Sequence, residues 1–435
     1  MVVNVTVVDP AAAGYLTVYP AGTPRPGTSN VNFVRHNTVA NLAIVRVGAG
    51  GGITIFNGSS GTAEVIADIT GYINPPDSTR SVFTWARNNY GQLGNGEANF
   101  DRQLTPAQVH GIDGVRMLAA GGDSDYALRA DGTVRAWGAN AAGDLGDGST
   151  IDRATPVAVS GLTNVVGIAA ALFSGYALKS DGTVWAWGYN YYGALGDGTT
   201  VNRLTPIRIA ALSDVVAISA SYESGYAVRS DGTVWGWGLN DKGQLGDGST
   251  TSTVVPVQVK ALRNIVSIAA QGWNGYALRS DGTVWAWGAN SGGSLGNGSP
   301  DQHGLSGSST PVQVTGLTGV KAIAAGVYAG YALYGDGTMS AWGDNYYGEL
   351  GDGTTINRLA PVTLGLSHVA AFGAGHASAY AVIDNGTAMS WGENLYGELG
   401  DGTKVNSSTP HLIPGLSGVS AITGGENTAV AISGG

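Results

Sequence analysis

The chain has 435 residues, of which 71 are glycine and only 12% are charged. Glycine is thus about twice as frequent as in an average protein, and charged residues are about half as frequent. A disordered chain is excluded because 43% of the residues are hydrophobic, and collagen is excluded because 15 prolines are too few. What remains is a β-rich repeat protein whose glycines serve turns.

Cysteine is absent, which excludes disulfide bonds and thiolate chemistry. No apolar run is long enough for a membrane-spanning helix, and Met1 leads into the strand-like Val2 to Thr6 instead of a signal peptide. The formal net charge of −10 disfavours nucleic acid as a partner.

The first eighty residues contain six strand-like runs between glycine-rich turns, which predicts a small β-sandwich-like domain over residues 1–73. Residues 74–80, with Pro75 and Pro76, form the predicted linker. The segments Gly14 to Pro20, Asn41-Leu42, Ile66 to Asp68 and Tyr72 resemble a domain that is common in secreted actinobacterial proteins, here without its first strands. The runs are Val2–Val8, Tyr15–Tyr19, Val31–Val34, Leu42–Val47, Ile53–Phe56 and Ala63–Ile69.

A repeat of about fifty residues occupies the rest of the chain. Its closing tryptophan recurs seven times, at spacings of 52, 50, 50, 50, 55 and 49 residues. The seven are Trp85, Trp137, Trp187, Trp237, Trp287, Trp342 and Trp391. Each repeat holds four strand-like runs, and the second and third are joined by a turn such as Asp281-Gly282, for which a type I′ hairpin is expected. Four short antiparallel strands per repeat are typical of a propeller blade.

The two ends of the repeat region complete each other. The region begins with a third strand, Ser81 to Trp85, and ends with a first and a second strand, Val419 to Ile422 and Thr428 to Ile432. These strands are expected to share one blade and so to close the ring without an open edge. The predicted fold is all-β, with a closed seven-bladed β-propeller over residues 81–435.

The pattern of Ala-Leu, Asp-Gly-Thr-Val and Trp-Gly-x-Asn-x-x-Gly-x-Leu-Gly-x-Gly resembles the repeat named for the regulator of chromosome condensation. The resemblance covers residues 81–435, although Ala86 replaces a glycine and Ser174 replaces the histidine that the family places before Ala-Leu. The family's founder is a nucleotide-exchange factor that docks on chromatin, but this chain has neither an inserted wedge nor a basic tail. Its uniform blades are similar to those of a secreted actinobacterial β-lactamase inhibitor, which implies a secreted or surface-bound binding protein.

Function is predicted on the face where the loops vary between repeats. Because strands alternate in direction, the loop before the second strand and the loop after the third lie on one face, and the uniform Asp-Gly turns lie on the other. Ten of the eleven tryptophans fall in third strands, where we expect them to form the core, whereas Trp273 is on a variable loop. Rigid aromatic loops suit recognition of a protein or peptide. The predicted binding residues are Tyr90, Asp123, Phe173, Tyr189, Tyr191, Tyr192, Tyr222, Glu223, Trp273, Tyr328, Tyr346, Tyr347, His376 and Tyr396.

Two alternatives remain open from the sequence. Aromatic rings beside acids and amides also suit a glycan, and Asp123, Glu223, His376 and Glu426 could converge at the propeller mouth as proton-transfer groups of an enzyme. No nucleophile elbow and no transition-metal ligand spacing occurs, so no catalytic residue, metal or cofactor is predicted. Ten turn aspartates account for much of the acidity through turn geometry, although calcium at these turns stays possible.

Overall fold

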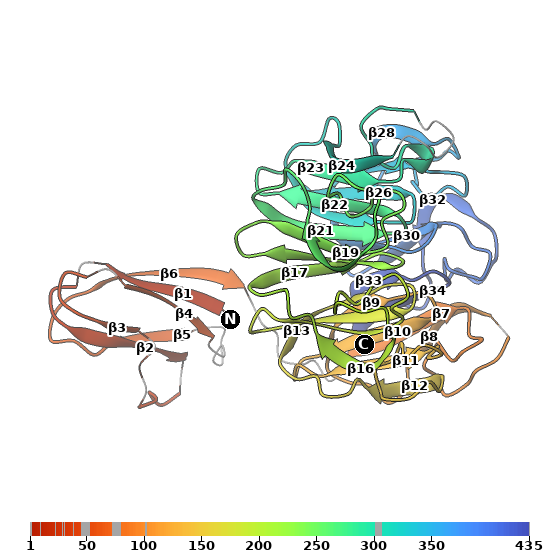
Figure 1. Cartoon of the computed structure of the whole chain (residues 1–435). Helices are drawn as coiled ribbons and strands as arrows, with labels where there is room; N and C mark the ends of the chain where they lie inside the picture. Colours follow the sequence, from red (N-terminus) through yellow and green to blue (C-terminus); the bar gives the residue numbers. More distant parts are fainter. Residues whose placement is uncertain are drawn as a thin grey trace. The chain divides into compact units, whose positions relative to one another are not determined.

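The computed structural model describes residues 2–8, 10–21, 23–27, 29, 31–37, 39–44, 53–71, 80–100, 102–300 and 307–434. The chain divides into two compact units, Met1–Asp77 and Ser78–Gly435 (Figure 1). Within the described residues, regular structure is β-strand apart from one short 3-10 turn, η1 (Ser291–Gly293). Tyr72 and residues 74–79 of the predicted linker lie outside the described residues.

The first unit consists of two three-stranded antiparallel sheets, in the orders β4-β1-β6 and β3-β2-β5. Val7 of the first sheet shares a buried cluster with Leu16, Val18, Val31 and Phe33 of the second, so the two sheets enclose one core. The fourth strand begins three residues earlier than expected. The strands are β1 (Val2–Val8), β2 (Gly14–Pro20), β3 (Val31–Phe33), β4 (Val39–Ile44), β5 (Ile53–Asn57) and β6 (Glu64–Gly71).

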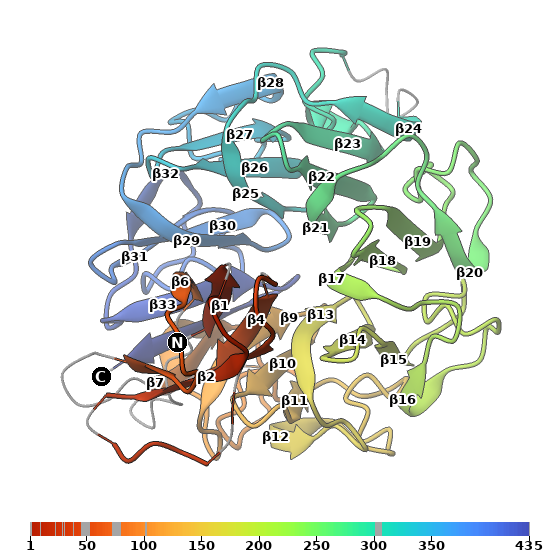
Figure 2. The same ribbon diagram turned by 90° about the vertical axis from the view of Figure 1, so that its left-hand side faces the viewer.

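The second unit contains seven four-stranded antiparallel sheets, which confirms the predicted propeller. Figure 2 shows the blades following one another around a ring. Blades 1 to 3 contain β9 (Val115–Ala120), β10 (Ser124–Arg129), β11 (Val134–Gly138) and β12 (Arg153–Ala158); β13 (Val165–Ala170), β14 (Ser174–Lys179), β15 (Val184–Gly188) and β16 (Arg203–Arg208); and β17 (Val215–Ala220), β18 (Ser224–Arg229), β19 (Val234–Gly238) and β20 (Thr253–Gln258). Blades 4 to 6 contain β21 (Ile265–Gln271), β22 (Asn274–Arg279), β23 (Val284–Gly288) and β24 (Ser308–Gln313); β25 (Val320–Ala325), β26 (Ala329–Tyr334), β27 (Met339–Gly343) and β28 (Arg358–Thr363); and β29 (Val369–Ala374), β30 (Ser378–Ile383), β31 (Ala388–Gly392) and β32 (Ser407–Leu412).

Blade 7 joins the two ends of the propeller, as predicted. It is ordered β33 (Val419–Gly424), β34 (Thr428–Gly434), β7 (Arg80–Ala86) and β8 (Gln103–Gln108). The last strand pairs antiparallel with the first over its whole length, from Thr428 opposite Ala86 to Gly434 opposite Arg80. The main-chain groups at both ends of the propeller are therefore paired inside a sheet.

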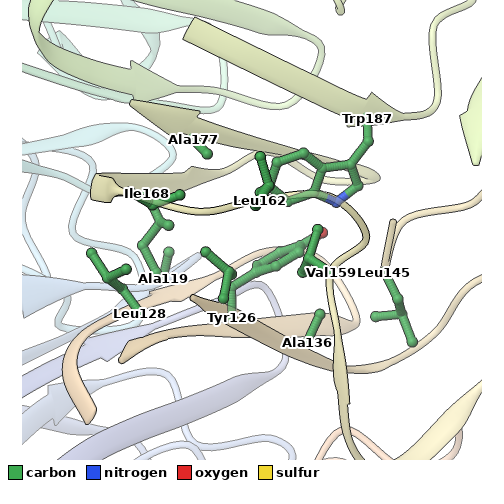
Figure 3. Close-up of a cluster of buried hydrophobic side chains, with 12 residues drawn as sticks. Ala119, Tyr126, Leu128, Ala136, Leu145, Val159, Leu162, Ile168, Ala177 and Trp187 are labelled. Carbon is green, nitrogen blue, oxygen red and sulfur yellow. The ribbon is translucent and has the colours of Figure 1, made fainter. Parts of the chain in front are cut away.

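A tyrosine and a tryptophan join each of blades 1 to 6 to the next blade, whereas blade 7 has Val430 in place of the tyrosine. Tyr126 in blade 1 lies edge-on to Trp187 in blade 2, with ring centroids 5.8 Å apart, and both rings are buried (Figure 3). The Asp144 carbonyl accepts hydrogen bonds from the Tyr126 hydroxyl (2.6 Å) and from Trp187 Nε1 (2.8 Å). The same tryptophan bond recurs at all seven blade junctions, so each buried ring has its polar atom satisfied.

The structure refines one detail of the sequence prediction and corrects another. Trp185, Trp235 and Trp285 pack against core clusters but are only half-buried, and a basic side chain lies over each ring. The Asp281-Gly282 turn is not type I′, because only Gly282 has a positive φ (79°), and Gly282 N bonds to Arg279 O. It is a type I turn with a glycine bulge, favoured because the Asp281 carboxylate accepts bonds from the amide and hydroxyl of Thr283.

Candidate functional site

The variable loops of each blade lie side by side on one face. In blade 2, Tyr189 N, directly after the third strand, donates a 2.9 Å hydrogen bond to Phe173 O, directly before the second. The Asp-Gly turns lie at the opposite end of the strands, where Ser180 N bonds to Asn164 O beside the start of β13. We call the first surface the variable-loop face. Equivalent bonds join Ala139 to Asp123, Leu239 to Glu223, Ala289 to Trp273, Asp344 to Tyr328 and Glu393 to Ala377.

Main-chain hydrogen bonds join neighbouring blades at five of the seven junctions around the propeller mouth on this face. Below the mouth, the first strands of all seven blades line an axial channel of about 320 Å³, mainly with alanine and isoleucine. The variable side chains therefore project from backbone that is fixed both within and between blades. The inter-blade bonds, of 3.0 to 3.1 Å, join Gly122 N to Leu172 O, Leu172 N to Tyr222 O, Val327 N to His376 O, His376 N to Gly425 O and Glu426 N to Gly121 O.

Blade 4 departs from this pattern. Its first and second strands pair up to Gln271 opposite Asn274, which leaves Gly272 and Trp273 as a two-residue turn. Gly272 has a φ of 56°, and the turn is of the II′ kind that glycine at this position permits. The tighter turn places Trp273 at the tip of a hairpin and the Gln271 side chain at the mouth of the channel.

Trp273 is the centre of a packed aromatic trio. Tyr222 lies edge-on to it at 5.0 Å, and Tyr328 stacks on it at 5.5 Å with an interplanar angle of 18°. All three rings are half-buried, and they come from three successive blades. The trio therefore forms a rigid ridge beside the mouth, and Trp273 is less accessible than its position on a variable loop suggests.

The other predicted rings gather in three places. Phe173, Tyr189, Tyr191 and Tyr192 form a chain of ring contacts in blade 2, with centroids 4.8 to 6.4 Å apart. Tyr346 and Tyr347 form an edge-on pair in blade 5, at 4.9 Å. Tyr346 and Tyr191, at 73% and 63% exposure, are the most exposed of the predicted rings.

In blade 7 and its neighbour, Tyr90 and Tyr396 flank the Arg87 guanidinium, at 5.9 and 5.6 Å from the two ring centres. Arg102 lies over Tyr396 at 4.6 Å and donates to the Leu395 carbonyl at 2.9 Å. These two rings are thus already engaged with cations of the chain itself.

Three of the four titratable residues expected at the mouth do converge. Burial raises the pKa of Glu426, and the His376 imidazole, the Asp123 carboxylate and Arg87 act on it as charged neighbours. Asp123 accepts a 2.9 Å bond from Gln92 and lies 3.7 Å from Arg87. Glu223 is placed elsewhere, since its charged neighbour is Asp241.

Several polar groups of this face already have partners among the described residues. His376 Nδ1 lies 3.7 Å from the Glu393 carboxylate, and this neighbour raises the pKa of the imidazole. Among the described residues, no group of three histidine, aspartate or glutamate side chains is arranged to hold a metal ion. The turn aspartates bind their own loops: Asp197, for example, accepts from Thr199 and from Arg203 at 2.6 Å.

The family assignment agrees with this geometry. The model of the RCC1-like domain matches residues 161–435, which is more than half of the chain. The chain belongs to the RCC1-like family. The model of the regulator of chromosome condensation (RCC1) repeat also matches residues 81–128 and 131–175, so the RCC1-like region extends over the whole propeller.

Curated relatives match only short parts of this RCC1-like chain. Human "Probable E3 ubiquitin-protein ligase HERC3" is 42% identical over 73 residues, which are 16% of this chain and 7% of that protein. The ultraviolet-B receptor UVR8 of Arabidopsis thaliana is 38% identical over 74 residues, 17% of this chain and 16% of the receptor. The chain therefore covers a small fraction of these relatives, and they leave the expected actinobacterial origin untested.

Two solved structures share the RCC1-like fold. Prp20p of Saccharomyces cerevisiae has a TM-score of 0.73 at 22% identity, covering 82% of this chain and 92% of Prp20p. Human WBSCR16 has a TM-score of 0.71 at 20% identity, covering 81% of this chain and 98% of WBSCR16. At these identities the likeness supports the fold alone.

Four buried acids behind the variable-loop face escaped the sequence prediction. Burial raises the pKa of Asp144, Glu349 and Glu398 to about 7 in each case, and that of Asp125 well above its usual value. The first three occupy the position before the Leu-Gly of each repeat, and there the Glu398 carboxylate accepts from Tyr396 N at 2.8 Å. An acid recurring at this position of the repeat was the sequence signal that could have revealed these three residues.

Proposed function

We propose that this RCC1-like propeller binds a protein or peptide partner through its variable-loop face. The observation that carries the proposal is the contrast between exposed rings and a fixed backbone. Tyr191 and Tyr346 are largely exposed, yet each stands on a loop closed by main-chain bonds, as Gly193 N to Asn190 O illustrates. Large rings with few rotamers on preorganised loops lose little entropy when they bind.

The comparisons support a binding role at the level of the family. The study of Prp20p names binding to Gsp1p and histones, and a second structure shows Prp20 bound to Kap60. A protein-binding role for the present chain is consistent with these examples, while its partner remains to be identified. We extend the proposal to a site of action outside the cell or at its surface, on the resemblance of residues 1–73 to a domain of secreted proteins.

The proposal is tested by comparing two triple variants of the full chain as bait. The first removes Tyr191, Tyr192 and Trp273 from the variable-loop face by substitution with alanine. The second changes Val166, Val216 and Val266, which are exposed near the starts of first strands on the opposite face, to alanine. Partners are captured from the medium and surface fraction of the source cells and identified by mass spectrometry.

We expect the first variant to lose at least one partner that the wild type and the second variant retain, with affinity reduced by about 2 kcal/mol or more. Circular dichroism controls for folding. A partner set that is identical for all three baits would refute the proposed face.

A further inference from the structure

The tyrosine pair of blade 5, in which Tyr346 is exposed and Tyr347 is half-buried, stands beside the Asp344 and Glu393 carboxylates. Asp344 directly follows β27 and bonds through its main-chain N to Tyr328 O, and Glu393 directly follows β31. The bond from Val327 N to His376 O holds blades 5 and 6 together at this point. We call this surface the blade 5/6 patch; it consists of Tyr328, Asp344, Tyr346, Tyr347, His376 and Glu393.

The carboxylates of the patch act on the tyrosines. Glu393 is the main cause that raises the pKa of Tyr347, and Asp344 adds to the effect of burial on Tyr328. Hydrogen bonds also join these residues, because Asp344 N bonds to Tyr328 O and Val327 N bonds to the carbonyl of His376, whose imidazole lies 3.7 Å from Glu393.

Negative charge in the patch is only partly balanced. Among the described residues, no lysine or arginine nitrogen lies within 4.0 Å of the Asp344 or Glu393 carboxylate, and Glu393 is paired with the His376 imidazole at 3.7 Å. Arg87 and Arg102 in the neighbouring sector lie over Tyr396, and Arg358 of blade 5 is paired with Asp352. A ligand that covered this patch without positive charge would desolvate the carboxylates with no compensation.

A second tyrosine pair provides the contrast. Tyr191 and Tyr192 in blade 2 occupy the same Asn-Tyr-Tyr-Gly loop as Tyr346 and Tyr347. On the corresponding loop of the next blade, however, the Asp241 carboxylate is paired with Lys242 at 3.3 Å. The two pairs are alike in ring geometry and differ in the charge around them.

Resting on the proposed function, we infer that the blade 5/6 patch receives a lysine or arginine side chain from a basic segment of the partner. The exposed face of Tyr346 offers a cation–π contact, the aliphatic stem of the incoming side chain packs on the rings, and Asp344 and Glu393 neutralise its charge. Charge complementarity therefore favours a basic peptide as the ligand of this part of the face.

The test uses a fluorescent penta-lysine peptide, with a Gly-Ser peptide of equal length as the neutral probe, and measures binding to the full chain by anisotropy. The patch variant is Glu393→Gln with Tyr346→Ala. The matched control is Glu97→Gln with Phe100→Ala, two exposed residues of a blade 7 loop outside the predicted binding set, which changes net charge and aromatic content equally. We expect penta-lysine to bind the wild type and the control alike, and the patch variant about tenfold more weakly.

Equal weakening in both variants would show diffuse attraction to an acidic protein and would overturn the inference, as would absence of penta-lysine binding to correctly folded wild type. Either result would leave the proposed function standing if partner capture still depends on the variable-loop face. Loss of face-dependent capture would refute the proposed function whatever the peptide does.

Discussion

Ala86 is the residue at which the propeller departs most clearly from its own repeat. It has a φ of 84°, in the region that glycine occupies in the other six blades, for example Gly188 at 100°. A non-glycine residue in this region costs about 1 kcal/mol or more. We expect Ala86→Gly to raise the free energy of unfolding by about 1 kcal/mol in urea. The reverse change, Gly188→Ala, should destabilise, because its Cβ would lie 2.5 Å from Phe173 O; a stabilising Gly188→Ala would contradict this account.

Asp125 carries a buried carboxyl where other blades have glycine or alanine, as at Ala379 and Ala429. Burial is the main cause of its raised pKa, so the native state holds a proton that the unfolded chain releases above about pH 4. Stability is therefore lost as pH rises from that value. We expect Asp125→Ala to stabilise by about 2 kcal/mol at pH 7 and by much less at pH 4. An equal gain at both pH values would indicate a packing effect instead.

Glu349 and Glu398 can be compared with glutamines that the protein already uses at the same position. Gln92 Oε1 accepts from Tyr90 N at 2.7 Å, as Glu349 does from Tyr347 N. The native pKa of both glutamates is about 7, against a usual value of 4.5. The native state therefore loses stability as pH rises from 4.5 to 7, and it loses no more from these groups above pH 7. We expect Glu349→Gln with Glu398→Gln to flatten this decline, by up to about 1.4 kcal/mol per pH unit for each group. Unfolding at pH 5 and 7.5 measures the difference, and an unchanged slope would contradict it.

At the scale of the element, the blade 4 hairpin controls the aromatic trio. A Cβ on Gly272 would lie 2.6 Å from Val327 O, and the residue has a positive φ. We expect Gly272→Ala to destabilise by about 1 kcal/mol and to alter the near-ultraviolet circular dichroism of the Tyr222–Trp273–Tyr328 contacts. Gly335→Ala is the matched control, because nothing lies within 4 Å of its added Cβ. A trio signal that survives Gly272→Ala would show that the turn does not position Trp273.

The blades were predictable from sequence because their repeat is local. Strand, turn and tryptophan recur within fifty residues, and periodicity reveals them. The type of the Asp281-Gly282 turn was not predictable, because it depends on the hydrogen bonds that the Asp281 carboxylate accepts from the amide and hydroxyl of Thr283. The stacking of Trp273 on Tyr328 and the convergence of Glu426 with His376 were harder still, because they depend on how separate blades meet.

At the scale of the whole molecule, the β34–β7 pairing holds the ring closed. Ser81 and Ser433 lie opposite each other in it, and the chain has no cysteine to mispair. We expect Ser81→Cys with Ser433→Cys to form a disulfide that raises the free energy of unfolding by about 4 kcal/mol, since it closes a very long loop. The reduced double variant serves as the control. If oxidised and reduced forms unfold at the same urea concentration, opening of this blade does not limit stability.

The same pairing makes the order of the blades cyclic. Because Gly434 lies opposite Arg80, these two positions could be joined by a short linker and new ends cut at another turn, giving a circular permutant with the same seven sheets. The position of a blade along the sequence then gives it no special place on the variable-loop face. Asp123 and Glu426, about 300 residues apart in sequence, are neighbours for any ligand, and a blade exchanged anywhere in the gene would reach the same binding surface.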